Sequence, residues 1–370
     1  MQKTNKDTAG TKAYSNVVVK KLPKSEVEIT GTIDAAAFEK FRNKALKNIN
    51  EELSIDGFRK GQIPEKVLVA KVGEMPILEE MAELALAAAY PEIVVEEKID
   101  ALGRPEIQIM KIAAGSPLEF KITTAVVPEV KLADYQKIAK EVAAEFSKDE
   151  AKQLEVTEKD IDVAIDRIRK SYAEHNHAHD ESHDEMSKED HDKAIEASMP
   201  PLDDAFAQTL GKFKDLAELR EKVRGTLADD KKDQLKEKRR IAMSDKISDG
   251  TEVDIPKVLV DSEVRRIEAQ FREDVARMGV TLEDYAKHAK KSIDDLRKEW
   301  MPHAEKKAKL QIILNKIAEA EKLQADAVEI EAEVKHIVDH YKDADNERAY
   351  IYAETVLTNE KVFQFLEEAK

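Results

Sequence analysis

Apolar and polar residues alternate in several stretches of the first 130 residues, which is the period of a β-strand with one buried face. In one stretch Val27, Ile29 and Ile33 share a face with Gly31, whereas glutamates and threonines occupy the other face. The sequence therefore predicts two pairs of strands. The alternating stretches are 14–33, which a turn at Pro23-Lys24 divides into two strands, 105–112 and 118–126.

Between the two strand pairs, apolar residues recur every three or four positions, as on the buried face of an α-helix. We expect the first helix to start after Asp34 and to end at Gly57. Pro64 can open a short second helix that Gly73 closes, and a third helix, rich in Ala and Leu, covers about 76–97. The apolar stripe of the first helix consists of Phe38, Phe41, Ala45, Ile49 and Leu53.

This order of elements predicts an α+β fold, in which an N-terminal antiparallel sheet with helices carries a loop and an elongated all-helical C-terminal domain follows. From about residue 131 onward the pattern is nearly all helical. Turn signals divide this part into helices of roughly 12 to 25 residues. These signals are Gly211, Gly225, Asp249-Gly250, Pro256, Gly279 and Pro302.

The composition favours long, exposed amphipathic helices over a thick core, because 37% of the 370 residues are charged, 5% are aromatic and the mean hydropathy is −0.56. The net charge of −16 opposes general nucleic-acid binding, so any RNA contact must come from a local basic patch. There is no cysteine, no apolar core of a secretory signal, and no apolar run near the ~20 residues of a membrane span. We therefore expect a cytoplasmic protein without a membrane partner.

The loop at 57–64, GFRKGQIP, lies between the first two expected helices and combines two glycines, a proline, an aromatic residue and two adjacent cations. One interpretation is a helix–helix turn with an incidental basic tip. The other is a docking loop, in which Arg59 and Lys60 contact an anionic partner and Phe58 is buried as an anchor. Residues 57–71 carry +3, from Arg59, Lys60, Lys66 and Lys71 against Glu65.

Residues 174–192 hold five of the nine histidines, many acids and almost nothing apolar, so we expect a flexible loop. His175, His177, His179 and His183 have the composition of a Ni²⁺, Cu²⁺ or Zn²⁺ site. Their spacing fits no defined zinc module and no cysteine is present. We therefore favour a solvated linker and expect no metal site and no cofactor.

No catalytic motif is found: the sequence has no cysteine nucleophile, no G-x-S-x-G elbow and no P-loop. The helical part instead carries apolar faces that suit a binding surface. Candidate contacts for apolar client segments are Met278, Leu310, Ile313 and Leu314, although packing between helices is the more ordinary explanation for each.

Together these features resemble trigger factor, the family of ribosome-associated chaperones of bacteria. GFRKGQIP matches the family's Gly-Phe-Arg-x-Gly-x-x-Pro docking signature, and the order of elements agrees over about 14–130. Similar segments follow in LDDAFAQTLG with LAELREKVR, in DGTEVDIPKVLVDSEVRRIEAQF, and in VTEKDIDVAIDRIRKSYA at 156–173. The resemblance implies ribosome-binding roles for Gly57, Phe58, Arg59, Lys60, Gly61 and Pro64.

The resemblance also implies a domain order from which one part is missing. Only 24 residues, 175–198, lie where the family carries an FKBP-like prolyl isomerase domain, and this is below the ~50-residue floor for a domain. We therefore expect no isomerase activity. The expected parts are a ribosome-binding domain at 1–130, a linker and connecting helix at 131–174, a flexible His/Asp/Glu-rich loop at 175–199, and a helical client-binding domain at 200–370.

The expected function is that of an ATP-independent chaperone which binds nascent and unfolded polypeptides. It would dock on protein and rRNA of the large ribosomal subunit near the nascent-chain exit. The sequence does not decide whether the chain forms a homodimer when it is off the ribosome. One alternative is an exported chaperone-isomerase of the SurA/PrsA type, against which the absent signal peptide argues. Another is a helical scaffold or metal-buffering protein, which only the His-rich loop supports.

Overall fold

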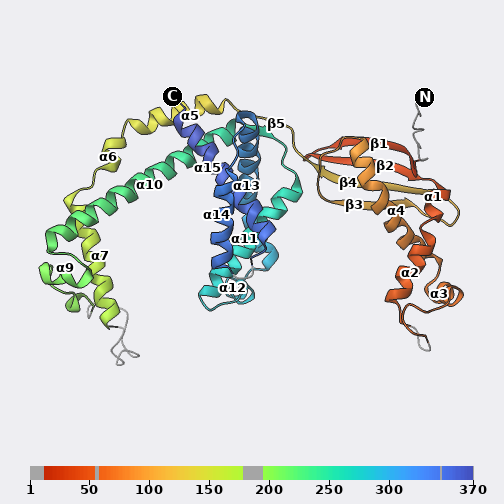
Figure 1. Cartoon of the computed structure of the whole chain (residues 1–370), viewed down its shortest axis with the longest axis horizontal. Coiled ribbons are helices and arrows are strands. Elements are labelled where there is room, and N and C mark those ends of the chain that lie inside the picture. Colours follow the sequence, from red (N-terminus) through yellow and green to blue (C-terminus); the bar gives the residue numbers. More distant parts are fainter. Residues whose placement is uncertain (1–11, 55–57, 178–194, 342–343, 370) are drawn as a thin grey trace, which may run out of the picture. The chain divides into compact units, whose positions relative to one another are not determined.

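The computed structural model describes residues 12–54, 58–177, 195–341 and 344–369. The chain forms two compact units, whose elements are labelled in Figure 1. We call them the sheet unit, Met1–Lys131 with Thr251–Lys316, and the helical unit, Leu132–Gly250 with Ile317–Lys370.

The sheet unit contains a four-stranded antiparallel sheet in the order β1-β2-β4-β3, which confirms the predicted strand pairs. Gly31 of the second strand lies opposite Phe120 of the fourth, and a Cβ on Gly31 would lie 2.6 Å from Phe120 Cζ. Only glycine therefore fits beneath this ring. The strands are β1 (Tyr14–Leu22), β2 (Glu26–Ile33), β3 (Ala101–Lys111) and β4 (Leu118–Val126).

Helices between β2 and β3 share one hydrophobic core with the sheet (Figure 1). Ile77, Met81 and Leu86 of the longest of these helices are buried in the same core as Ile29 and Phe120 of the sheet. The expected helical face on an antiparallel sheet is thus confirmed. The helices are α1 (Ala35–Glu39), α2 (Arg42–Glu52), α3 (Glu65–Val72) and α4 (Glu74–Glu96).

The single helix expected from Asp34 to Gly57 is wrong in its continuity and its end. The chain makes a tight turn, in which the Phe41 amide donates to the Phe38 carbonyl at 3.1 Å, and this separates α1 from α2. Leu53 already has extended backbone angles, φ −79° and ψ 140°, so α2 stops before the loop. Phe38 of α1 and Ala45 of α2 are nevertheless both buried in the same core.

The second part of the sheet unit is helical. A short antiparallel pair, β5 (Val130–Lys131) and β6 (Glu252–Val253), precedes it. The Phe271 ring lies 5.0 Å from that of Tyr285 and 5.4 Å from that of Trp300, so Trp300 is a packing residue. The helices are α11 (Lys257–Arg277), α12 (Leu282–His288) and α13 (Ile293–Glu321), whose last residues belong to the helical unit.

Two of the turn signals did not end helices. Pro302 lies inside α13 on an exposed position, so the hydrogen bond that proline removes is lost on the solvent side. Gly225 lies inside a helix whose neighbouring turns are held by the buried Leu219 and Val223. Tertiary packing therefore overrides the weak helix propensity of glycine at this position.

The helical unit is organised along its longest helix, α10, which has 35 residues. The first half of α10 packs with two other helices around a core that contains Ile161, Ala207 and Val223. The Lys231 ammonium of α10 contacts the Asp160 carboxylate at 2.9 Å and, with hydrogen bonds from Thr157, lowers the pKa of Asp160 to about 2. The helices are α5 (Tyr135–Ser147), α6 (Glu150–Leu154), α7 (Glu158–His177), α9 (Asp204–Leu210), α10 (Leu216–Gly250), α14 (Ala327–His340) and α15 (Asn346–Glu368).

Farther along α10, Arg240 holds α15 through two carboxylates. Its guanidinium donates to Glu360 at 2.8 Å and to Glu367 at 2.7 Å, and lies 5.1 Å from the centre of the Phe363 ring. The side chains of Arg240 and Glu367 are only 14% and 12% exposed. The hydrogen bonds from Arg240 lower the pKa of Glu360. This partly buried network links α15 to the second half of α10.

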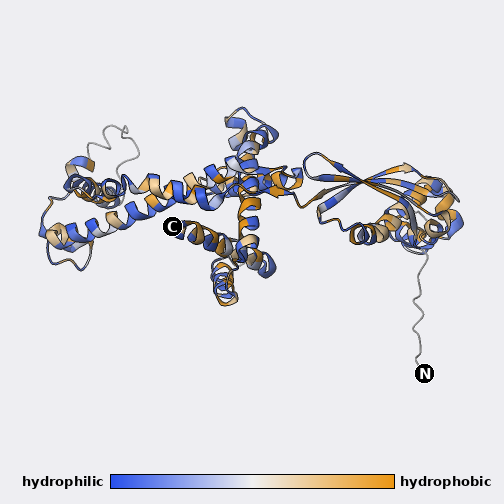
Figure 2. Ribbon diagram, turned by 90° about the horizontal axis from the view of Figure 1, so that it is seen from above, coloured by the Kyte–Doolittle hydropathy of each residue, from blue (hydrophilic) through white to orange (hydrophobic). Residues whose placement is uncertain are grey.

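Hydrophilic and hydrophobic residues alternate along the long helices rather than forming uniformly apolar segments (Figure 2). Among the described residues, no helix combines the length and the apolar character that crossing a membrane requires.

We predict that Arg240→Ala destabilises the attachment of α15 by on the order of 3 kcal/mol, because it leaves two carboxylates without their partner in a partly buried place. Lys246→Ala is the control, since Lys246 and Glu145 form an exposed pair whose loss costs about 1 kcal/mol at most. Hydrogen exchange of the α15 amides measures both effects. Equal exchange rates in the two variants would contradict the role of Arg240.

Candidate functional site

The candidate docking loop connects α2 to α3 and is described from Phe58 onward, so the predicted site residue Gly57 lies outside the described residues. The Gln62 amide donates to the Arg59 carbonyl at 3.0 Å and closes a turn. Gly61 has φ +78°, and a Cβ there would meet nothing within 4 Å. Glycine is therefore needed at this position for its backbone angle rather than for space.

Asn50 of α2 fastens the base of the loop. Its side-chain amide donates to the Ile63 carbonyl at 3.0 Å, and its side-chain oxygen accepts from the Ile63 amide at 3.1 Å. The Asn50 carbonyl also accepts from the Gly61 amide at 3.0 Å. Ile63 itself is buried in the core of the sheet unit, and Pro64 caps α3 directly after it. Three hydrogen bonds and one buried side chain thus define the return of the loop.

The tip of the loop faces solvent. Phe58 is 40% exposed, and the side chains of Arg59 and Lys60 are exposed. Neither cation has an ion-pair partner among the described residues, whereas many of the other surface cations are paired with acids of the chain. The loop therefore presents an aromatic ring beside two cations that are available to an external anion.

Two contacts hold α2, which carries the loop, on α4. The Arg42 guanidinium binds both carboxylate oxygens of Glu74, one of them at 3.1 Å, and these hydrogen bonds lower the pKa of Glu74. The Asn48 side chain donates to Glu80 at 2.7 Å. The support of the loop is thus a pair of helices joined by a bidentate ion pair between Arg42 and Glu74 and a hydrogen bond from Asn48 to Glu80.

The sequence pointed to the loop but not to Asn50. An asparagine near the end of a helix is an ordinary surface residue in a one-dimensional pattern. Its role depends on Ile63, thirteen positions later, coming back to the same turn of α2. A weak signal does exist in the sequence, since the asparagine carboxamide, like that of glutamine, can both donate to and accept from one peptide unit.

The structure separates the four candidate client-binding residues. Met278, after α11, is 77% exposed, and Leu310 is half-buried. Ile313 and Leu314 are 0% and 5% exposed. Their apolar character therefore serves packing, and only Met278 and Leu310 are carried into the surface proposed below.

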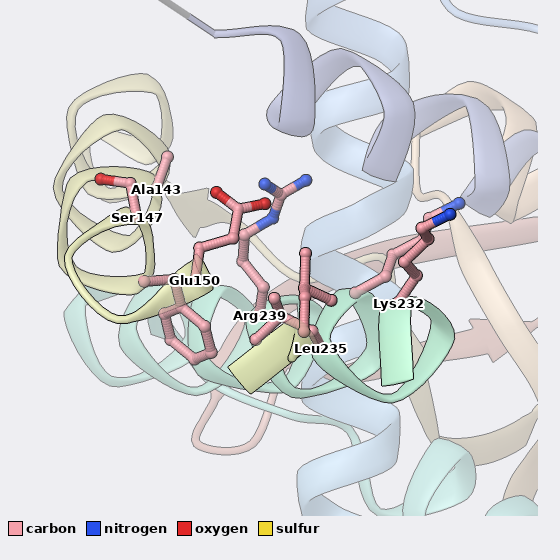
Figure 3. A pocket seen from close by; sticks show the side chains of 9 residues that line it. Ala143, Ser147, Glu150, Lys232, Leu235 and Arg239 are labelled. Atoms are coloured by element: carbon pink, nitrogen blue, oxygen red, sulfur yellow. The ribbon is translucent and has the colours of Figure 1, made fainter. Parts of the chain in front are cut away.

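Other apolar surface lies in the helical unit, where the sequence pattern did not single it out. A groove of about 480 Å³ between α7, α9 and α10 is lined largely by apolar residues, among them Ile168, Phe213 and Leu227. A second cavity, of about 380 Å³, lies between α5, α6 and α10 (Figure 3). Figure 3 shows Leu235 at its base and the charged ends of Glu150, Lys232 and Arg239 above it.

The four weak metal candidates are not brought together in the described structure. His175 is exposed near the end of α7 and His177 is its last residue, while His179 and His183 lie outside the described residues. Within the described ranges, no three His, Cys, Asp or Glu side chains are grouped so as to hold an ion.

Comparisons with known proteins match most of the chain to one family. The family model described as "Bacterial trigger factor protein (TF)" matches residues 15–168, and the one for its C-terminus matches residues 215–370. Trigger factors of Moorella thermoacetica and Carboxydothermus hydrogenoformans are both 28% identical, over 86% and 94% of this chain and 85% and 97% of theirs. That of Bacillus subtilis is 26% identical over 86% of this chain and 90% of its own.

A solved structure supports the fold. It is described as "Promiscuous Substrate Recognition in Folding and Assembly Activities of the Trigger Factor Chaperone". The likeness covers 96% of this chain and 100% of that one, with a TM-score of 0.51 and 16% sequence identity. At this identity the likeness bears on the fold alone.

We predict that Asn50→Ala speeds hydrogen exchange of the Ile63 amide by about 10- to 100-fold, because a buried donor loses a bond worth about 1–3 kcal/mol. Amide exchange measured by NMR tests this. Asn48→Ala is the matched control, since it removes the bond to Glu80 and leaves Ile63 bonded. An unchanged Ile63 amide in Asn50→Ala would show that the clamp does not hold the loop.

Proposed function

The chain belongs to the bacterial trigger factor family, in a form without the middle FKBP-like domain, and we propose that it docks on the large ribosomal subunit through Phe58, Arg59 and Lys60. It is a chaperone in protein folding, with the ribosome and unfolded polypeptides as its partners. The match to this family replaces the two alternative functions considered above.

The observation that carries the docking proposal is the contrast between the base and the tip of the loop. Asn50 and the buried Ile63 fix the base, while Arg59 and Lys60 at the tip have no acidic partner among the described residues. The cationic segment 57–71 carries +3 in a chain of −16. Phosphates of rRNA or acidic side chains near the nascent-chain exit are therefore attracted to this loop and repelled elsewhere, which favours a single orientation.

Phe58 supplies the apolar part of the same contact. A ring that is 40% exposed in the unbound chain has apolar area left to bury in a pocket of the partner. Aromatic residues at the centre of an interface commonly contribute about 2 kcal/mol or more, whereas rim charges mainly set the encounter rate and the salt dependence. Phe58 is thus the proposed anchor, and Arg59 and Lys60 are proposed to speed the encounter with the anionic partner. Gly61 and Pro64 shape the backbone after them.

Client binding is proposed for dispersed apolar surface rather than for one deep pocket. Met278 and Leu310 contribute in the sheet unit and at its end, and the groove between α7, α9 and α10 contributes in the helical unit. Several weak contacts let an unfolded segment bind and leave without nucleotide hydrolysis. The chain is proposed to act in the cytoplasm, and neither docking nor client binding as proposed requires a homodimer.

We predict that Phe58→Ala, Arg59→Ala and Lys60→Ala together abolish co-sedimentation with ribosomes, and that Phe58→Ala alone raises Kd about 30-fold, the equivalent of about 2 kcal/mol. The matched control is Met301→Ala with Lys306→Ala and Lys307→Ala, which removes one exposed apolar and two exposed cationic side chains from α13. Wild-type binding by the triple loop variant at moderate salt would rule out this docking site.

We also propose that the chain does not catalyse prolyl isomerisation, because the family's FKBP-like domain is missing from it. A prolyl peptide mixed with the protein should relax at its uncatalysed rate, over tens of seconds or more at about 25 °C. A prolyl isomerase added to the same sample is the positive control. Enzyme-like acceleration that scales with the concentration of the chain would contradict this proposal.

A further inference from the structure

Two histidines lie one helical turn apart near the end of α14. His336 and His340 are both exposed, their ring centres are 4.4 Å apart, and the ring planes are inclined by 42°. A separation of four residues places both side chains on one face of the helix. Neither histidine lines the cleft between α14 and α15, so both rings remain accessible.

The hydrogen bond of His340 leaves one of its ring nitrogens available. Nδ1 of His340 lies 3.0 Å from the backbone carbonyl of His336. A carbonyl can only accept, so Nδ1 carries the proton and the neutral ring has its lone pair on Nε2. Metal-binding histidines characteristically make this type of bond, because it fixes the ring and the tautomer.

We propose that His336 and His340 form a two-histidine site for a divalent transition metal ion that prefers imidazole nitrogen. Metal–nitrogen bonds of about 2.0–2.1 Å place two nitrogen ligands roughly 3 Å apart, a span that rings 4.4 Å apart can reach by small side-chain rotations. The same four-residue spacing brings the two histidines of helical zinc motifs onto one ion. Water fills the remaining positions, since the described residues offer no third grouped ligand.

The surroundings favour a cation of this class. α14 carries Glu329, Glu331, Glu333 and Asp339 against Lys335, and Lys361 of α15 pairs with Glu329 at 3.1 Å, so these groups together carry −2 with neutral histidines. This negative field attracts divalent ions in general. The two imidazoles then select Cu²⁺, Ni²⁺ or Zn²⁺ over Mg²⁺ and Ca²⁺, which prefer oxygen ligands. The site does not depend on the proposed docking or client binding.

Binding would link two successive turns of α14. Because the two nitrogens come together only when these turns are helical, the ion binds the folded helix more tightly than the open one. Bound metal should therefore slow the opening of the last turns of α14. This local effect distinguishes the site from metal bound anywhere else on the chain.

His288 provides an internal comparison. Its Nδ1 lies 2.7 Å from the carbonyl of Asp284, four residues earlier, as in the bond between His340 and His336. The residue four positions before His288 is an aspartate instead of a second histidine. His288→Gln therefore removes one exposed helical histidine without touching the pair.

The test is a Zn²⁺ titration of the full chain, read by hydrogen exchange over 327–341. This local measurement keeps any Zn²⁺ bound by other histidines of the chain out of the result. Zn²⁺ at micromolar to submillimolar concentration should slow exchange there in wild type and in His288→Gln, and Mg²⁺ should not. In His336→Gln the Zn²⁺ concentration that gives half the effect should rise at least tenfold.

Three outcomes would overturn the proposal. The first is the absence of any Zn²⁺-dependent protection of 327–341 in wild type up to about 1 mM, which corresponds to a Kd weaker than about 1 mM. The second is equal protection in wild type and His336→Gln. The third is that the side-chain NMR signals of His336 and His340 stay unchanged when Zn²⁺ is added.

Discussion

The arrangement of the helical unit depends on the contact between Arg240 and the two carboxylates of Glu360 and Glu367. Glu360 and Glu367 lie 120 and 127 positions after Arg240 in the sequence. The residues between Arg240 and Glu360 include the second part of the sheet unit. No local preference brings α15 back to α10, and the Arg240 network acts there together with the burial of Val362 and Leu366 of α15. A guanidinium is suited to this role because its fixed fork can hold two carboxylates at once, whereas an ammonium is a single point charge. Most other ion pairs of the described residues are exposed and contribute little by comparison.

The docking loop is held in the opposite way, by short-range contacts. Asn50 and Ile63 are only thirteen positions apart, so closing the loop costs little chain entropy. The loop therefore keeps its shape by means of the sheet unit alone and does not rely on the helical unit. This independence fits a chain in which docking and client binding are proposed for different parts. Loss of a middle domain from the family's usual order then leaves the support of the loop untouched, because that support lies within residues 42–80.

The strand pairs and the α3 helix were predictable because alternating residues and the Pro64 and Gly73 boundaries are local signals. The break between α1 and α2 was not predictable from the sequence, because the apolar stripe continues across it. The turn that ends at Phe41 is visible only in the three-dimensional structure. The candidate site shows the same division. The loop stood out by composition and by its resemblance to a known family, whereas Asn50 acts through a partner that the linear pattern does not indicate. Burial of Ile313 also depends on tertiary packing, which an apolar run alone cannot distinguish from exposure.

The strong negative charge of the chain connects the two proposed activities. Exposed apolar side chains such as Met278 and Ile351 promote self-association in a protein of low charge, and a net charge of −16 opposes it. The same charge repels nucleic-acid phosphates over most of the surface, which fits the proposed docking through the cationic segment 57–71. Salt screens the attraction at the loop, while burial of apolar area is not weakened by screening. The proposed docking thus adds electrostatic attraction to apolar burial, whereas the proposed client binding rests on apolar burial, so salt should weaken docking more than client binding.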